Sequence, residues 1–171
     1  MSGTANDAEL TPELAATIAA AFAKRDRANM GPTIEFFERL LAQHPGNPYV
    51  LYEVGGSYDT AGQEDTAIEY YGKALPGLSG VIRQRCLLQY GSSLRNLGRY
   101  DESRQVLEQA RAEFPDSDSL RVFAALTAHA SGHPDQALGA LLELIADRVD
   151  SAEIKRYEPA IRGHAAALAP G

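Results

Sequence analysis

The sequence contains a single cysteine, Cys86, among 171 residues. One thiol cannot form an intramolecular disulfide, so the fold has no disulfide framework and the sequence gives no sign of an oxidising compartment. A lone cysteine in an apolar segment is typical of a small buried side chain rather than of a reactive thiol. We therefore expect Cys86 to be buried.

Long apolar runs are also missing, since no stretch approaches the ~20 residues that a bilayer-spanning helix needs. The first residues, Met-Ser-Gly-Thr-Ala-Asn-Asp, lack the basic start and apolar run of a signal peptide. We therefore expect a cytoplasmic location. Disorder is expected at the two ends, over residues 1–10 and 169–171.

Valine and isoleucine are sparse, whereas alanine and leucine dominate the apolar residues. β-Branched residues lose rotamer freedom in a helix, so this balance favours helices over strands. The formal net charge is -7, which disfavours general binding to phosphate backbones. Residues 81–111 are a local exception, with six arginines against three acidic residues.

Catalytic motifs are absent as well. The sequence has no glycine-rich phosphate loop ending in lysine, no nucleophile elbow and no paired cysteines. His129 and His133 are four residues apart, a spacing that can bind a metal on a helix, but Gly132 and Pro134 place the second histidine in a turn. We therefore expect no catalytic residues, no cofactor and no metal.

A repeat is present instead. Gly62, Gly98 and Gly132 recur at intervals of 36 and 34 residues, each followed by Asp three places later and by a small residue two places further on. Periods of this size are typical of stacked supersecondary units. Apolar and small residues recur at spacings of three and four on both sides of each glycine, which predicts a helix, a short turn and a second helix per repeat.

These residues resemble the tetratricopeptide-repeat (TPR) family, whose 34-residue repeat places bulky, small and aromatic residues at fixed positions of two helices. The second and third repeats match in register, and the fourth retains mainly its small residues, with Arg121 at a position where a bulky apolar residue is expected. The matching residues are Leu51, Val54, Gly55, Tyr58, Ala67, Tyr71 and Ala74; Leu87, Tyr90, Gly91, Leu94, Ser103, Leu107, Ala110 and Pro115; and Ala125, Ala137, Leu141 and Leu144.

The resemblance implies an all-α fold, a right-handed superhelix of about four helical hairpins followed by a C-terminal capping helix. Asn47, Thr11 and Ser151 are predicted N-caps, and Pro45, Pro76 and Pro115 fall where helices should stop. The first helix is expected over 11–28, and Pro159 should kink or divide the last one. The expected single domain covers 11–168, with hairpins at 11–45, 48–76, 81–115 and 118–147 and the capping helix at 151–168.

In TPR proteins the first helix of each repeat lines a concave groove that binds a protein or peptide. Carried over by register, the resemblance implies that the partner-binding residues here are Tyr49, Tyr52, Asp59, Arg85, Leu88, Ser92, Arg95, Asn96, Val122, Leu126 and His129. Tyrosine and arginine are common anchors of protein interfaces. Arg85 and Arg95, with or without Asn96, are candidates to receive an acidic group of the partner. The alternative is that these arginines only solvate a helix face or pair with neighbouring acidic residues.

Other functions remain open from the sequence. The chain could be a homodimeric scaffold, in which residues outside the expected core, such as Tyr70, Val122 and Leu126, contact a second copy. It could also be an enzyme subunit built on the helical repeat, or a nucleic-acid binder that uses the arginine-rich helices. We take a non-catalytic protein-interaction module as the leading hypothesis, although fold alone does not determine function.

Overall fold

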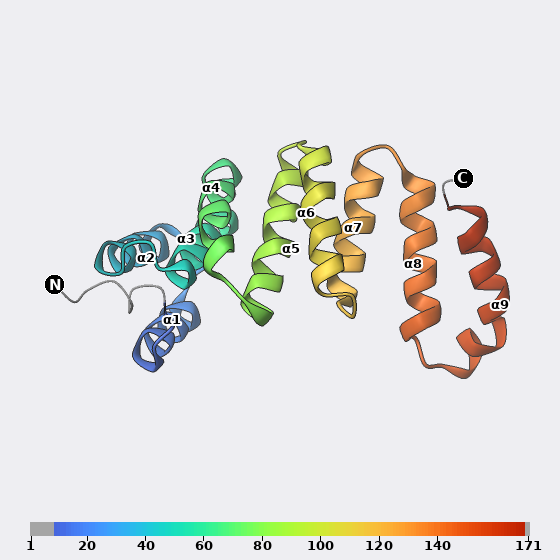
Figure 1. The fold of residues 1–171 in the computed structure, drawn as a ribbon, viewed down its shortest axis with the longest axis horizontal. Coiled ribbons are helices and arrows are strands. Elements are labelled where there is room, and N and C mark those ends of the chain that lie inside the picture. Colours follow the sequence, from blue (N-terminus) through green and yellow to red (C-terminus); the bar gives the residue numbers. More distant parts are fainter. Residues whose placement is uncertain (1–8, 170–171) are drawn as a thin grey trace. The chain divides into compact units, whose positions relative to one another are not determined.

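The computed structural model in Figure 1 describes residues 9–169. Within this range all regular secondary structure is helical, and no strand is present. The predicted all-α class is therefore confirmed. The predicted disorder over 1–10 and 169–171 falls mainly on residues outside the described part. The helices are α1 (Pro12–Lys24), α2 (Gly31–Gln43), α3 (Pro48–Thr60), α4 (Glu64–Ala74), η1 (a 3-10 turn, Leu75–Gly77), α5 (Gly80–Asn96), α6 (Tyr100–Glu113), α7 (Asp118–Ala130), α8 (Pro134–Arg148) and α9 (Ala152–Ala167).

The helices group into two compact units that meet in sequence at Leu97 and Gly98. Unit 1 contains α1 to α5, and unit 2 contains α6 to α9. Within each unit, helices that are consecutive in sequence pack on one another, and in unit 1 α3 also contacts α5. This is the contact pattern of stacked helical hairpins.

The helix ends follow local sequence signals. The side chains of Thr11, Asn47 and Ser151 each accept a backbone hydrogen bond from the first turn that follows, so all three predicted N-caps are confirmed. The helices α2, α4 and α6 each end two residues before a proline, as predicted.

The predicted extent of the first helix is wrong. The first helix does not reach residue 28 but ends at Lys24, because Arg25 is extended and the Asp26 carboxylate accepts a hydrogen bond from the Ala28 N–H at 2.9 Å, which forms a turn. Of the two expected effects of Pro159, a kink or a division of the last helix, division does not occur: α9 runs as one helix through Pro159, which removes one backbone hydrogen bond.

The repeated glycines end helices. Gly62, Gly98 and Gly132 have φ values of 75°, 75° and 87°, a conformation that residues with a Cβ rarely adopt. After Gly62, the Gln63 N–H donates to the Tyr58 carbonyl at 2.9 Å, and after Gly132 the His133 N–H makes the equivalent bond at 2.9 Å. These bonds satisfy helix-end carbonyls in a Schellman motif and explain why glycine recurs at this position.

The core of unit 1 is formed by the residues that the repeat pattern selected. Tyr71, Ala67 and Val54 are fully buried, and Leu51 is 8 % exposed. Cys86 is also fully buried, as predicted, and burial raises the pKa of its thiol to about 12. Two packed clusters result, one around Tyr71 and one around Phe37, which is 1 % exposed.

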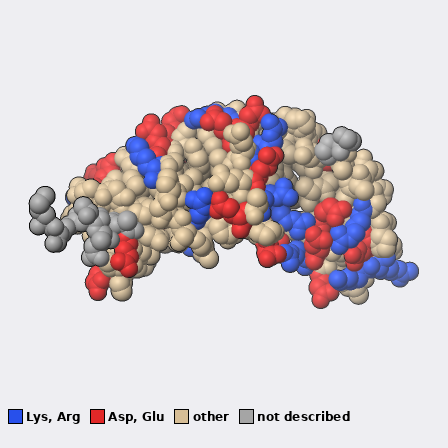
Figure 2. Space-filling view, viewed as in Figure 1, with Lys and Arg blue, Asp and Glu red and all other residues tan. Residues whose placement is uncertain are grey.

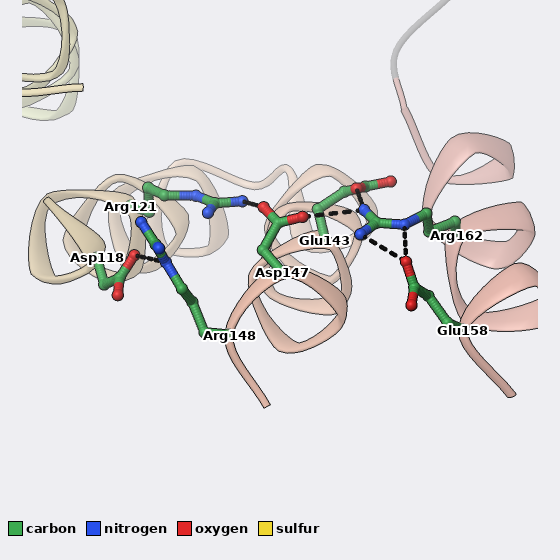
Figure 3. Close-up of polar contacts among 7 residues, drawn as sticks. All are labelled: Asp118, Arg121, Glu143, Asp147, Arg148, Glu158 and Arg162. Carbon is green, nitrogen blue, oxygen red and sulfur yellow. Dashed lines mark hydrogen bonds and ion pairs between the residues drawn. The ribbon is translucent and has the colours of Figure 1, made fainter. Parts of the chain in front are cut away.

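Unit 2 is held together by small buried residues and ion pairs. Arg121, at the position where a bulky apolar residue was expected, is half-buried and pairs with Asp147 of α8 at 2.7 Å. Arg162 of α9 binds the same carboxylate at 3.0 Å and Glu143 at 2.8 Å (Figure 3). The ion pairs therefore link α7, α8 and α9 on the side where the repeat motif is weakest.

The surface near these helices carries both charges. In Figure 2, acidic and basic side chains alternate closely over the part of unit 2 that contains α8 and α9. Within residues 9–169, no helix combines the length and the apolar character needed to cross a bilayer.

Candidate functional site

Unit 1 contains a cavity that opens to solvent between α1, α3 and α5, which are the first helices of successive hairpins. Residues of α2 form one wall of the cavity. Its volume is about 720 Å³, within the ~300–1,000 Å³ of sites that enclose a ligand or a side chain of a partner. We call it the unit 1 cavity. The residues that line it are Leu10, Ala15, Ile18, Ala19, Phe22, Arg25, Arg27, Thr33, Phe37, Tyr49, Tyr52, Glu53, Gly56, Ser57, Asp59, Thr60, Ile82, Arg85 and Gln89.

Aromatic side chains form part of this lining. Tyr49 and Tyr52 come from the first two turns of α3, where Asn47 and Pro48 begin the helix. Tyr52 is only 8 % exposed, and burial raises the pKa of its hydroxyl. Phe22 on α1 is 48 % exposed, and the Arg25 guanidinium lies 3.7 Å from the centre of its ring. The cavity therefore offers aromatic surface that a partner can cover.

Three arginines surround the cavity, namely Arg25 and Arg27 at the end of α1 and Arg85 on α5. Among residues 9–169, none of these three guanidinium groups is in an ion pair or a side-chain hydrogen bond with the protein. Arginines of unit 2 differ, since Arg121 and Arg162 are engaged by carboxylates. The basic groups of the unit 1 cavity are thus available to another molecule.

Glu53 lies in the same lining, on α3 between the tyrosines and Gly56. Burial raises the pKa of its carboxyl group to about 7, while the positive charges of Arg25 and Arg85 oppose the shift. Desolvation therefore outweighs the attraction of the arginines. At neutral pH this side chain is divided between its charged and uncharged forms.

Asp59 is held from inside unit 1. One carboxylate oxygen accepts a hydrogen bond from the Ser93 hydroxyl at 2.9 Å, and the other lies 3.3 Å from the Tyr71 hydroxyl. The Tyr71 hydroxyl also lies 3.1 Å from the Gln89 side chain, so its single proton goes to one of the two acceptors. Burial is the largest influence on Asp59 and raises its pKa. Asp59 thus links α3, α4 and α5.

The predicted groove residues on α5 are only partly brought together. Arg85 lines the unit 1 cavity, whereas Leu88, Ser92, Arg95 and Asn96 do not. Arg95 donates to Ser92 at 3.0 Å, and Asn96 donates to the Glu64 carboxylate at 2.7 Å.

Arg85, Arg95 and Asn96, which we expected to receive an acidic group, do not line one common cavity. Ten residues separate Arg85 from Arg95 on one helix, which corresponds to about 15 Å along its axis.

The remaining predicted residues belong to unit 2. Val122 is half-buried on α7, and Leu126 and His129 are exposed there. A smaller cavity of about 360 Å³ lies between α6, α7 and α8, but none of these three residues lines it. Tyr70, considered for self-association, is instead stacked on Tyr58 within unit 1, with ring centres 5.8 Å apart.

The cavity residues that were not predicted from the sequence include Phe22, Arg25, Arg27, Glu53 and Gln89. Glu53 and Gln89 occupy the same register position, the sixth of their repeats, so this shared position could have indicated a further groove-facing site. Phe22 and the two arginines lie on or after the alanine-rich α1, where the repeat pattern is poor. No periodic signal was available there.

Comparisons with known proteins agree with the repeated helical fold. The sequence matches the family described as "Tetratrico peptide repeat" over residues 48–168, which is well over half of the chain. No curated protein matches the sequence. The matched range begins at α3 and ends just after α9, and it includes every helix whose repeat register was assigned. The chain belongs to the tetratricopeptide-repeat family.

Proposed function

We propose that the protein is a non-catalytic interaction module whose unit 1 cavity holds a segment of a partner protein. Repeats of this family generally mediate protein–protein interaction. The observation that supports the proposal here is the gathering of Tyr49, Tyr52 and Arg85 around one open cavity. These residue types anchor partners because they bring a large contact area and directed hydrogen bonds together.

The cavity also has the composition of a recognition site rather than of a reaction centre. Asp59 is occupied by internal hydrogen bonds, and the three arginines cannot act as general bases because they stay protonated. The Ser57 hydroxyl lies one turn from Glu53 in the lining, but it donates to the Glu53 backbone carbonyl at 2.8 Å rather than to the carboxylate. We therefore assign binding to the cavity and no chemical step.

The test is affinity capture with the full chain from lysate of the source cells, followed by mass spectrometry. We expect Tyr49→Ala with Arg85→Ala to lose the partners that the wild type retains, because both side chains line the unit 1 cavity. The matched control is Tyr157→Ala with Arg156→Ala, which removes an exposed aromatic and arginine pair from α9. Equal capture by both double variants would refute the cavity as the binding site.

A homodimeric scaffold is the second candidate, and one feature of unit 2 favours it. Leu138 and Ile145 lie seven residues apart on α8, and Val149 follows four residues later, directly after the helix; they are 50 %, 38 % and 41 % exposed. Such spacing is typical of a helix that packs against another helix, and a second copy offers the same surface.

Sedimentation at micromolar concentration distinguishes the two candidates. The scaffold is supported if the wild type is a dimer and the double variant Leu138→Glu with Ile145→Glu is a monomer. A monomeric wild type excludes the scaffold. The cytoplasmic location expected from the sequence stays a prediction.

A further inference from the structure

The distribution of charge in unit 1 is unlike that of the whole chain. The protein has a formal net charge of -7, yet three arginines and only two carboxylates line the unit 1 cavity. Of those carboxylates, Asp59 is already hydrogen-bonded to Ser93. Glu53 is therefore the one negative group of this lining that remains to balance the arginines.

Glu53 faces charged groups from two other elements. Arg25 lies at the end of α1, Arg27 follows it in the turn, and Arg85 projects from α5. On α3 itself the neighbouring titratable residues of the lining are Tyr49, Tyr52 and Asp59, and α2 contributes only uncharged Thr33 and Phe37. Both Arg25 and Arg85 act electrostatically on Glu53, without a direct ion pair to it within the described residues.

We propose that the unit 1 cavity receives an acidic segment of a partner protein. A carboxylate of this segment replaces the negative charge of Glu53 between Arg25 and Arg85. Glu53 takes up a proton from solvent as the segment binds. This inference rests on the proposed function. It adds the chemical class of the partner and a dependence on pH.

Charge complementarity supports an acidic segment. A carboxylate that enters the lining gains charge-assisted hydrogen bonds from guanidinium groups that are otherwise in contact with water, and these bonds are about twice as strong as neutral ones. The aromatic surface of Phe22 and Tyr49 lies beside the arginines, so an apolar residue next to the carboxylate is also accommodated.

The same geometry explains the proton. Two carboxylates in one partly buried space repel each other, and the one with the higher pKa is neutralised first. Glu53 has a pKa of about 7, because burial raises it, whereas an exposed carboxylate of a peptide titrates near ~4. Glu53 is therefore the group that becomes protonated, and the affinity falls as the pH rises through about 7.

The first test selects ligands from a displayed library of random eight-residue peptides, with the full chain as bait at pH 6.5. We expect aspartate and glutamate to be enriched in the selected peptides, next to aromatic or aliphatic residues. Arg25→Glu with Arg85→Glu should lower the affinity for the selected peptides at least tenfold. The control, Arg39→Glu with Arg156→Glu, makes the same charge change at exposed positions of α2 and α9 and should change the affinity less than twofold.

The second test measures the affinity of the best acidic peptide between pH 6 and pH 8, where its own carboxylates stay ionised. The wild type should lose about five- to tenfold in affinity over this range, because one proton is taken up on binding. Glu53→Gln should bind as tightly at pH 8 as the wild type does at pH 6, with no dependence on pH.

Several results would overturn the inference. Selection of neutral or basic peptides, or acidic binding that survives the double arginine reversal, contradicts the acidic segment. A flat pH profile in the wild type, or an unchanged profile in Glu53→Gln, contradicts proton uptake. If the selected peptides are not acidic but their binding still depends on Tyr49, only this inference fails. If no peptide depends on Tyr49 or the arginines for binding, the proposed function fails as well.

Discussion

Gly55 of α3 lies against the buried ring of Tyr71 in α4, so closely that a Cβ on Gly55 would be 2.9 Å from both Cδ1 and Cε1 of the ring. Tyr71 is fully buried, so its ring has no free space into which it can move. The small residue that the family pattern places at this position is therefore required by an aromatic ring of the next helix.

This contact predicts the effect of a single methyl group. Gly55→Ala should lower the free energy of unfolding by about 1–3 kcal/mol relative to Gly56→Ala, because overpacking a filled core costs about that much. At Gly56 the nearest side-chain atom to an added Cβ is 3.9 Å away, so that control should be neutral or slightly stabilising. Urea unfolding checks the difference, and equal stability of the two variants would contradict the close approach.

The raised pKa of Glu53 predicts a dependence of stability on pH. The pKa of the Glu53 carboxyl group is about 7 in the folded chain, whereas its ordinary value is 4.5. Between these two pH values the folded state therefore binds more protons than the unfolded state. The free energy of unfolding contributed by this group therefore falls as the pH rises from 4.5 to 7 and is constant above, by on the order of 1–3 kcal/mol.

Glu53→Gln should remove this dependence, because it has no proton to lose. Glu69→Gln, at an exposed position of α4, is the control and should keep the profile of the wild type. Unfolding by urea at several pH values measures the effect. A wild-type stability that rises over this range would show that the arginines, rather than burial, dominate at Glu53.

The Asp147 ion pairs predict sensitivity to salt. Arg121 and Arg162 hold the pKa of Asp147 below its usual range, so the stabilisation is present above the ordinary pKa of aspartate and is lost as the pH falls below it. Asp147→Asn should lower the Tm at low salt, and the loss should shrink at 1 M salt, where the screening length is about 3 Å. Asp150→Asn, whose carboxylate is 95 % exposed, is the control. A loss that is the same at both salt concentrations would indicate packing rather than charge.

Cys86 predicts slow chemical labelling. Its side chain is fully buried and its pKa is about 12, so almost no thiolate is present at pH 8. A thiol reagent should react at least about a hundredfold more slowly with the folded chain than with the urea-unfolded chain, since the thiolate is the reactive form. Fast labelling of the folded protein would show that α5 opens readily from α4.

Local and periodic signals in the sequence predicted the structure correctly. Gly62 ends a helix because only its positive φ closes the Schellman bonds, and Asn47 begins one because its side chain accepts N–H groups two and three residues ahead. Two features were not predicted: the turn stabilised by Asp26 that ends α1 early, and the hydrogen bond that Arg95 donates to Ser92. Those outcomes depend on contacts that a repeat register does not contain.

The order of residues alone determined that this chain is helical, where most of its helices begin and end, and which positions must be small, because propensity, capping and a 34-residue period act over one or two turns. Only the tertiary structure decided that Arg25 and Arg27 join Arg85 around one cavity and that Glu53 is partly desolvated among them. The physical reason is that a cavity and its electrostatics arise between helices far apart in sequence, where distance through space, rather than spacing along the chain, sets burial and charge interaction.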